Sequence, residues 1–180
     1  MTTQTLPKTG TWDIDPAHSQ IEITARHLMV SKVRGTFQAF SGSVTIGESP
    51  EESSVEIVID ATSVNTGSDD RDGHLRSPDF LDVEAHPTIT FQSTSVVRSG
   101  SGYELIGNLT LRGVTKPLTL DMEYLGTVSD PQGNEKTVFN ATGSFEREDW
   151  GLTWNVPLDA GGILVSKKFE IDITLQAAQG

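Results

Sequence analysis

The sequence contains no cysteine, little positive charge and no long apolar run. Without cysteine the chain forms no disulfide bond, no thiolate metal site and no cysteine nucleophile. No apolar run approaches the roughly 18 residues that a transmembrane helix needs. The 13 Lys and Arg residues stand against 25 Asp and Glu residues, which gives a net charge of −12. This acidity disfavours nucleic acid as a partner, because its phosphates require cations, and it opposes electrostatic docking on anionic membranes.

The length of 180 residues suits one domain. Residues 1–9 are polar and lack the apolar segment of a signal peptide, so we expect a flexible N-terminal segment followed by a single domain over residues 10–178. Stable membrane insertion is not expected. The absence of a signal predicts a cytoplasmic protein, whereas a chain whose leader had been removed would be periplasmic or secreted.

Alternation of apolar and polar residues dominates the chain and is typical of antiparallel strands with one buried face. Strands are expected in residues 19–26, 33–46, 55–61, 88–97, 103–111, 118–124, 139–145 and 169–175. The alternation slips near Ala39 and Phe40, which predicts a bulge there. Together these segments predict an all-β sandwich or barrel of about eight strands.

Residues 68–84 break the alternation and predict a helical excursion between two strands. Ser68 is suited to cap a short helix, and Pro78 ends it before a second short helical piece. The apolar side chains of Leu75 and Phe80 need a surface to cover, and the open end of a barrel would provide one.

The residues leave open whether the interior is hollow. Small residues recur among the apolar faces, namely Gly42, Ser93, Gly107 and Gly143. They either leave room for an apolar ligand or stand at bulges of a tightly packed sandwich. Trp154 likewise either plugs a barrel end or lines the mouth of a cavity.

No motif for catalysis or metal binding is present. The spacing of the four histidines matches no metal site, so we expect no metal. The sequence has neither a Gly-x-Ser-x-Gly nucleophile motif nor a phosphate-binding glycine loop. We therefore expect no catalytic residue.

Three longer segments carry a resemblance to a known family. They are Trp-Asp-Ile-Asp-Pro-Ala-His-Ser at 12–19, Arg-Asp-Gly-His-Leu-Arg-Ser-Pro-Asp-Phe-Leu-Asp at 71–82, and Gly-Asn-Leu-Thr-Leu-Arg-Gly-Val-Thr-Lys-Pro-Leu-Thr-Leu at 107–120. The sequence resembles the YceI-like family of bacterial, lipocalin-like proteins that bind polyisoprenoid lipids, and the likeness spans roughly residues 10–175.

The resemblance implies an antiparallel lipocalin-like barrel of about eight strands with a short helical excursion near residues 68–84. It implies non-catalytic binding, transport or storage of a polyisoprenoid or other long apolar lipid, such as a polyprenyl quinone. No cofactor is required, and the partner is the apolar lipid itself. The resemblance also allows a homodimer, for which the sequence shows no interface.

On this interpretation the inward strand faces and the excursion form an apolar cavity wall. The predicted wall residues are Ile21, Ile23, Phe37, Ile57, Ile59, Leu75, Phe80, Phe91, Leu109, Leu111, Met122, Phe139, Phe145, Ile171 and Ile173. The predicted head-group end is formed by His18, His27, Arg71, His74 and Trp154. The adjacent Lys167 and Lys168 lie either near a head group or on the barrel rim.

Two alternatives remain beside lipid binding. The first is a lipid-modifying enzyme, an isomerase or hydrolase, that uses His18, His27 or His74 with Asp72 at the cavity mouth. The second is a stress-related interaction module whose acidic surface, rather than its cavity, carries the function.

Overall fold

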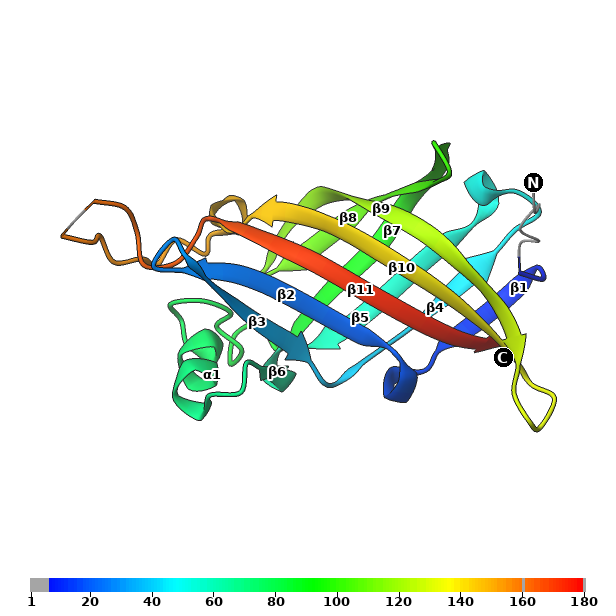
Figure 1. Ribbon diagram of the computed structural model, residues 1–180, viewed down its shortest axis with the longest axis horizontal. Helices are drawn as coiled ribbons and strands as arrows, with labels where there is room; N and C mark the ends of the chain where they lie inside the picture. The colour runs from blue at the N-terminus through cyan, green and yellow to red at the C-terminus, as the bar shows by residue number, and fades with distance from the viewer. Residues whose placement is uncertain (1–6, 160, 180) are drawn as a thin grey trace.

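The alternating segments form antiparallel strands in the computed structural model, which describes residues 7–159 and 161–179 (Figure 1). In this part of the chain the strands are β1 (Gly10–Ile14), β2 (Gln20–His27), β3 (Ser31–Phe37), β4 (Phe40–Ile46), β5 (Ser54–Asp60), β6 (Val64–Asn65), β7 (Thr88–Ser99), β8 (Gly102–Leu111), β9 (Val114–Ser129), β10 (Glu135–Glu146) and β11 (Lys168–Gln179). One α-helix, α1 (Asp69–Arg76), lies beside them.

Strand β1 closes the barrel, because it pairs with β4 on one side and with β11 on the other. The order around the barrel is β1, β4, β5, β7, β8, β9, β10 and β11. Every neighbouring pair is antiparallel. The predicted antiparallel barrel of about eight strands is therefore confirmed.

Strands β2, β3 and β6 extend the sheet beyond β1, and we call these three strands the extension. The last strand, β11, pairs with β1 through residues 177–179 and with β2 through residues 170–174. Strand β3 pairs with β2, and β6 pairs with β3. The segment predicted as one bulged strand over 33–46 is divided, since β3 ends at Phe37 and β4 begins at Phe40. The chain thus passes from the extension to the barrel where the alternation slips.

Large side chains fill the end of the barrel where β1 pairs with the end of β11. Trp12 is 0% exposed, and its indole nitrogen donates a hydrogen bond of 2.9 Å to the Lys8 carbonyl. The rings of Tyr124 and Phe139 pack 5.4 Å apart. Of the segment predicted to be flexible, residues 1–6 lie outside the described residues. We call this filled region the packed half.

The helical excursion begins where the sequence predicts it. The Ser68 hydroxyl accepts a hydrogen bond of 3.3 Å from the Arg71 amide, so it caps α1. The second helical piece does not form, because residues 78–85 adopt turns. Asp82 has a φ of 48°, and its amide bonds to the Ser77 carbonyl, which leads the chain back toward α1.

Candidate functional site

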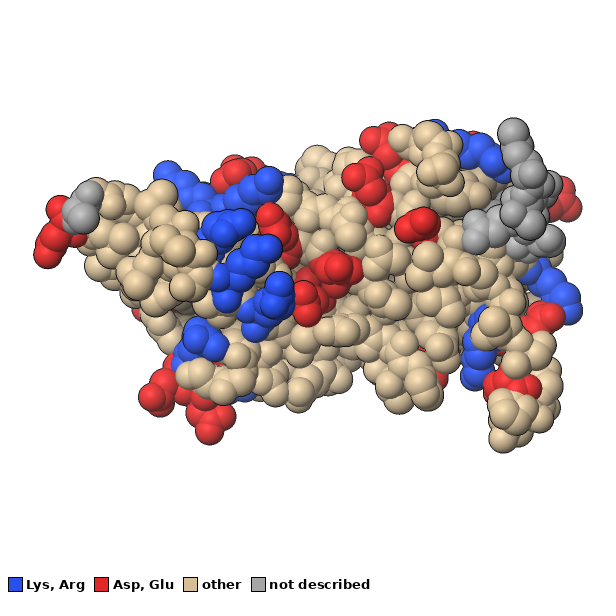
Figure 2. All heavy atoms as spheres, in the orientation of Figure 1, with Lys and Arg blue, Asp and Glu red and all other residues tan. Residues whose placement is uncertain are grey.

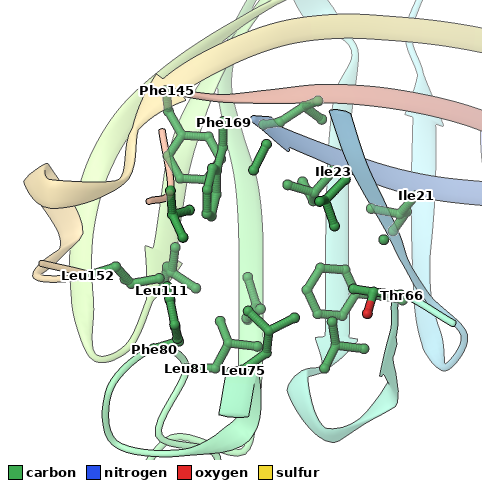
Figure 3. Close-up of a pocket in the computed structure, with 18 of the residues that line it drawn as sticks. Ile21, Ile23, Thr66, Leu75, Phe80, Leu81, Leu111, Phe145, Leu152 and Phe169 are labelled. Atoms are coloured by element: carbon green, nitrogen blue, oxygen red, sulfur yellow. The ribbon is translucent and has the colours of Figure 1, made fainter. Parts of the chain in front are cut away.

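A cavity of about 440 Å³ lies between the extension, the helical excursion and strands β5, β7, β8 and β11 (Figure 3). Aliphatic and aromatic side chains make up nearly all of its wall. Thirteen of the predicted wall residues line it: Ile21, Ile23, Phe37, Ile57, Ile59, Leu75, Phe80, Phe91, Leu109, Leu111, Phe145, Ile171 and Ile173. Further apolar side chains complete the wall, among them Val33, Val64, Leu81, Ile89, Leu118, Leu152, Leu164, Val165 and Phe169.

The small residues singled out in the sequence do not make the room. Gly42, Ser93, Gly107 and Gly143 are absent from the cavity wall. A Cβ atom at Gly107 would lie 2.6 Å from the carbonyl oxygen of Gln92, so glycine permits the close approach of neighbouring strands. The small residues that do line the cavity are Ala25 on β2 and Gly35 on β3.

Two predicted wall residues, Met122 and Phe139, line a separate space of about 40 Å³ in the packed half. The reason is that aromatic packing around Phe139 fills that half. Ile57 and Ile173 line both spaces, so their side chains form the partition between them. The barrel therefore has one filled half and one hollow half.

Polar side chains gather at the mouth of the cavity. Of the residues that line it, Arg26, His27, Asp70 and Arg71 are exposed, which locates the opening between β2 and α1. The Arg71 guanidinium donates two hydrogen bonds to Thr66, one of 2.7 Å to the hydroxyl and one of 2.8 Å to the carbonyl. These bonds fix one cation at the rim.

An aromatic group stands on the other side of the mouth. The His74 ring meets Trp154 edge-on with ring centres 4.5 Å apart, and Phe80 with ring centres 5.1 Å apart. A hydrogen bond of 2.8 Å joins His74 Nε2 to the Asp79 carboxylate. Four of the five residues predicted for the head-group end, His27, Arg71, His74 and Trp154, thus lie at the cavity.

His18 is the exception among the predicted head-group residues. It lies on a one-turn helix between β1 and β2 and is absent from the cavity wall. Its Nδ1 atom hydrogen-bonds to the Asp15 carboxylate at 2.7 Å, and this bond lowers the pKa of Asp15. The one-turn helix offsets β2 from β1 and leaves His18 exposed on the outer surface.

The histidine–aspartate constellation of the enzyme alternative does not form. Asp72 is only 5% exposed, and its carboxylate accepts hydrogen bonds from the amide and hydroxyl of Thr66 at 2.8 and 2.6 Å. His74 instead bonds to Asp79. Asp72 therefore supports the loop that holds Arg71 rather than orienting a histidine.

Sequence reasoning missed Arg147, which is 0% exposed. Its guanidinium donates to the carbonyls of Ser166, Leu152 and Val165 at 2.8, 2.5 and 3.3 Å. It lies 5.8 Å from the centre of the Phe80 ring and 5.9 Å from that of Phe169. Burial lowers the pKa of the guanidinium.

Arg147 connects the end of β10 to the segment 152–166, which supplies part of the cavity wall. The signal in the sequence was a basic residue three positions before a tryptophan and a glycine, in the string Arg-Glu-Asp-Trp-Gly-Leu at 147–152. The two acidic residues that follow Arg147, Glu148 and Asp149, are typical of a solvent-exposed turn, so the sequence did not indicate that Arg147 is buried.

Two negative findings concern the described part of the chain, residues 7–159 and 161–179. It contains no group of three or more side chains placed to hold a metal ion. No helix in it is both long enough and apolar enough to cross a bilayer.

The fold and the cavity together define a class of protein, a closed antiparallel barrel that encloses an apolar chamber with a polar mouth. The chain belongs to the YceI-like family, since the model of the YceI-like domain matches residues 12–177. The resemblance seen in the sequence is thereby confirmed.

Individual relatives agree with this assignment. A protein of Serratia proteamaculans described as a UPF0312 protein is 43% identical over 137 residues, which cover 76% of this chain and 71% of the relative. The crystal structure of the Campylobacter jejuni YCEI protein is 27% identical with a TM-score of 0.73, over 86% of this chain and 90% of that one. A polyisoprenoid binding domain from Saccharophagus degradans shares the fold at 17% identity, with a TM-score of 0.68 over 94% of this chain and 98% of that one.

Proposed function

We propose that this protein binds a polyisoprenoid or another long apolar lipid in its cavity and carries or stores it without chemical change. The observation that carries this proposal is an apolar cavity of about 440 Å³ whose polar groups lie at the mouth. Its volume is within the range of about 300–1,000 Å³ found for small-molecule sites. The neighbour described as a polyisoprenoid binding domain supports the choice of ligand class.

The free energy for such binding comes from burial of the tail. Each buried methylene contributes about 0.8 kcal/mol, so a five-carbon unit contributes at most about 4 kcal/mol. Association costs about 4–15 kcal/mol in lost freedom, and a single unit therefore gives no useful affinity. A ligand with several units overcomes this cost, which favours a long chain over a short terpene.

The mouth favours a head group that accepts hydrogen bonds. Arg71 presents a donor there, with His27 and His74 nearby. A quinone, whose carbonyl oxygens are acceptors, would satisfy these donors while its tail enters the apolar chamber. We therefore propose a polyprenyl quinone as the first ligand to test.

The first test is extraction of the purified protein with organic solvent followed by mass spectrometry, together with uptake of a polyprenyl quinone from detergent. We expect a polyprenyl lipid in stoichiometric amount in the extract, or uptake of the added quinone. A protein that retains no lipid and takes up none would overturn the proposal.

A matched pair of variants ties uptake to the cavity. Ala25→Trp places a large ring inside the chamber, because Ala25 lines it. We expect affinity to fall at least about tenfold, which corresponds to lost burial of about two methylene groups. Val58→Trp adds the same ring to a position 41% exposed on β5 and should leave uptake unchanged.

A further inference from the structure

The turn between β2 and β3 presents three consecutive apolar side chains to solvent. Leu28, Met29 and Val30 are 47%, 59% and 78% exposed. Leu28 and Met29 have φ values of 54° and 62°, in the left-handed region where hairpin turns favour asparagine and glycine. The turn thus combines backbone strain with exposed apolar surface, although the Met29 sulfur packs against the backbone of Gly162 in the neighbouring loop. Such a violation of local rules indicates a functional constraint.

A second loop enlarges this apolar surface. The Leu28 amide donates a hydrogen bond of 2.8 Å to the Leu164 carbonyl, which joins the turn to the segment 155–165. Val156 in that segment is 41% exposed. We call Leu28, Met29, Val30 and Val156 the apolar tip.

Four cations lie directly behind the apolar tip on the outer face of the sheet. Arg26 and Lys32 face each other across the β2–β3 pair, and Arg34 follows on β3. Lys168 begins β11, next to Ser166, whose amide donates to the Arg26 carbonyl at 2.9 Å. We call Arg26, Lys32, Arg34 and Lys168 the basic row. Figure 2 shows a band of Lys and Arg side chains at this end of the barrel.

The Arg26–Lys32 pair does not stabilise the sheet. Like charges directly opposite each other on neighbouring strands destabilise a sheet. In the described part of the chain Arg26, Lys32 and Lys168 form no ion pair, while Arg34 reaches Glu22 at 3.8 Å. Three cations are therefore free to meet an external anion, although the chain as a whole carries a charge of −12.

Carboxylates share this face with the basic row. Glu146 lies directly opposite Lys168 across β10 and β11, and Glu170 lies opposite Thr24, which in turn pairs with Arg34. Glu22 pairs with Asp172 across β2 and β11, beyond the basic row along the strands. At physiological ionic strength charges are screened over about 8 Å, so an anionic surface at the tip acts mainly on the nearest side chains. Two exposed carboxylates oppose the attraction, that of Asp159 in the same loop as Val156 and that of Asp70 at the mouth of the cavity.

We propose that the apolar tip and the basic row dock this protein on a bilayer surface that contains anionic phospholipid. Interfacial binding combines insertion of apolar side chains with electrostatic attraction between cations and anionic head groups, and this surface supplies both. The mouth of the cavity opens beside it, because Arg26 and His27 line the cavity and are exposed. A docked protein would present its opening at the level of the lipid head groups.

The test measures co-sedimentation of the full chain with vesicles of phosphatidylcholine containing about 30% phosphatidylglycerol, and with vesicles of phosphatidylcholine alone. We expect binding to the first, weaker binding as salt is added, and little binding to the second. Equal binding to both vesicle types, or none to either, would overturn the proposal.

Charge variants locate the surface. Each cation near an anionic leaflet strengthens binding about fivefold, so Lys32→Gln combined with Lys168→Gln should weaken it about 30-fold. Lys8→Gln combined with Arg98→Gln makes the same change in net charge elsewhere and should alter binding less than about twofold. Asp159→Asn should strengthen binding. Equal losses in the two double variants would overturn the assignment of the surface.

Two further measurements separate this proposal from its rivals. Lys32 and Lys168 do not line the cavity, so quinone uptake from detergent should be unchanged in their double variant, whatever the cavity binds. Met29→Ser combined with Val30→Ser should reduce vesicle binding without a change in oligomeric state. If that variant instead abolishes a dimer and leaves vesicle binding intact, the tip is a contact between two copies and the proposal fails.

Discussion

Replacement of Arg147 by methionine tests whether one buried cation organises the hollow half of the barrel. Methionine is similar in length but makes no hydrogen bond to a carbonyl. Three carbonyl oxygens would lose the guanidinium, those of Leu152, Val165 and Ser166. Val165 keeps a second donor, because the Asn155 side-chain amide bonds to it at 2.8 Å. Two carbonyl groups would therefore be left without their donor.

The expected magnitude follows from those two groups. An unsatisfied buried polar group costs about 1–3 kcal/mol, so Arg147→Met should lower the free energy of unfolding by about 2–6 kcal/mol. The substitution also removes the free-energy cost of burying the charged guanidinium, which offsets part of the loss. We therefore expect a value in the lower part of this range. Arg147→Lys should recover only part of the loss, since a single ammonium group cannot span carbonyls on both sides of the loop.

Urea-induced unfolding followed by circular dichroism gives the free energies. The matched control is Arg98→Met, which removes an exposed guanidinium 6.0 Å from the Tyr103 ring and should change stability by less than about 0.5 kcal/mol. Hydrogen exchange should quicken most in the segment 152–166. If Arg147→Met proves as stable as the control, the guanidinium does not hold this segment and the reasoning is refuted.

Three other changes test separate parts of the barrel. Gly107→Ala should lower the free energy of unfolding by about 1–3 kcal/mol in a urea titration, because its Cβ would lie 2.6 Å from a backbone carbonyl oxygen. Ser68→Ala removes the cap of α1 and should lower it by about 1 kcal/mol in the same titration. The hydrogen bond from His18 lowers the pKa of Asp15 in the folded protein. The ionised carboxylate therefore stabilises the fold at pH values above its ordinary pKa of about 3.9. This stabilisation is lost as the pH falls through the lower pKa that Asp15 has in the folded protein. The difference in unfolding free energy between the protein and Asp15→Asn, measured against pH, should therefore shrink below about pH 4.

Alternation of apolar residues was enough to predict the strands and one apolar face on each of them, but not which of those faces line the cavity. It was not enough to predict where along the barrel a side chain would lie. Phe139 and Phe145 are both buried residues of β10, yet only Phe145 lines the large cavity, while Phe139 belongs to the packed half. Pairing of β11 with both β1 and β2 determines this difference, and such long-range register has no local signal.

At the mouth of the cavity, too, some residues could be predicted from the local sequence and others depend on contacts between distant segments. His74 and Arg71 were predictable because they share one short helix with a capped start. Arg147 was not, because its burial depends on the segment 152–166 folding back over it. The basic row escaped notice for the same reason, since pairing of β2 with β3 and β11 assembles cations that the sequence scatters over residues 26–168.

The partition made by Ile57 and Ile173 gives the barrel a floor. Under the proposed function, a lipid tail that enters at the mouth extends into the cavity until it contacts these two side chains. The distance from the mouth to the floor therefore limits the length of tail that the cavity can hold. Smaller side chains at these two positions would join the two spaces and admit longer tails.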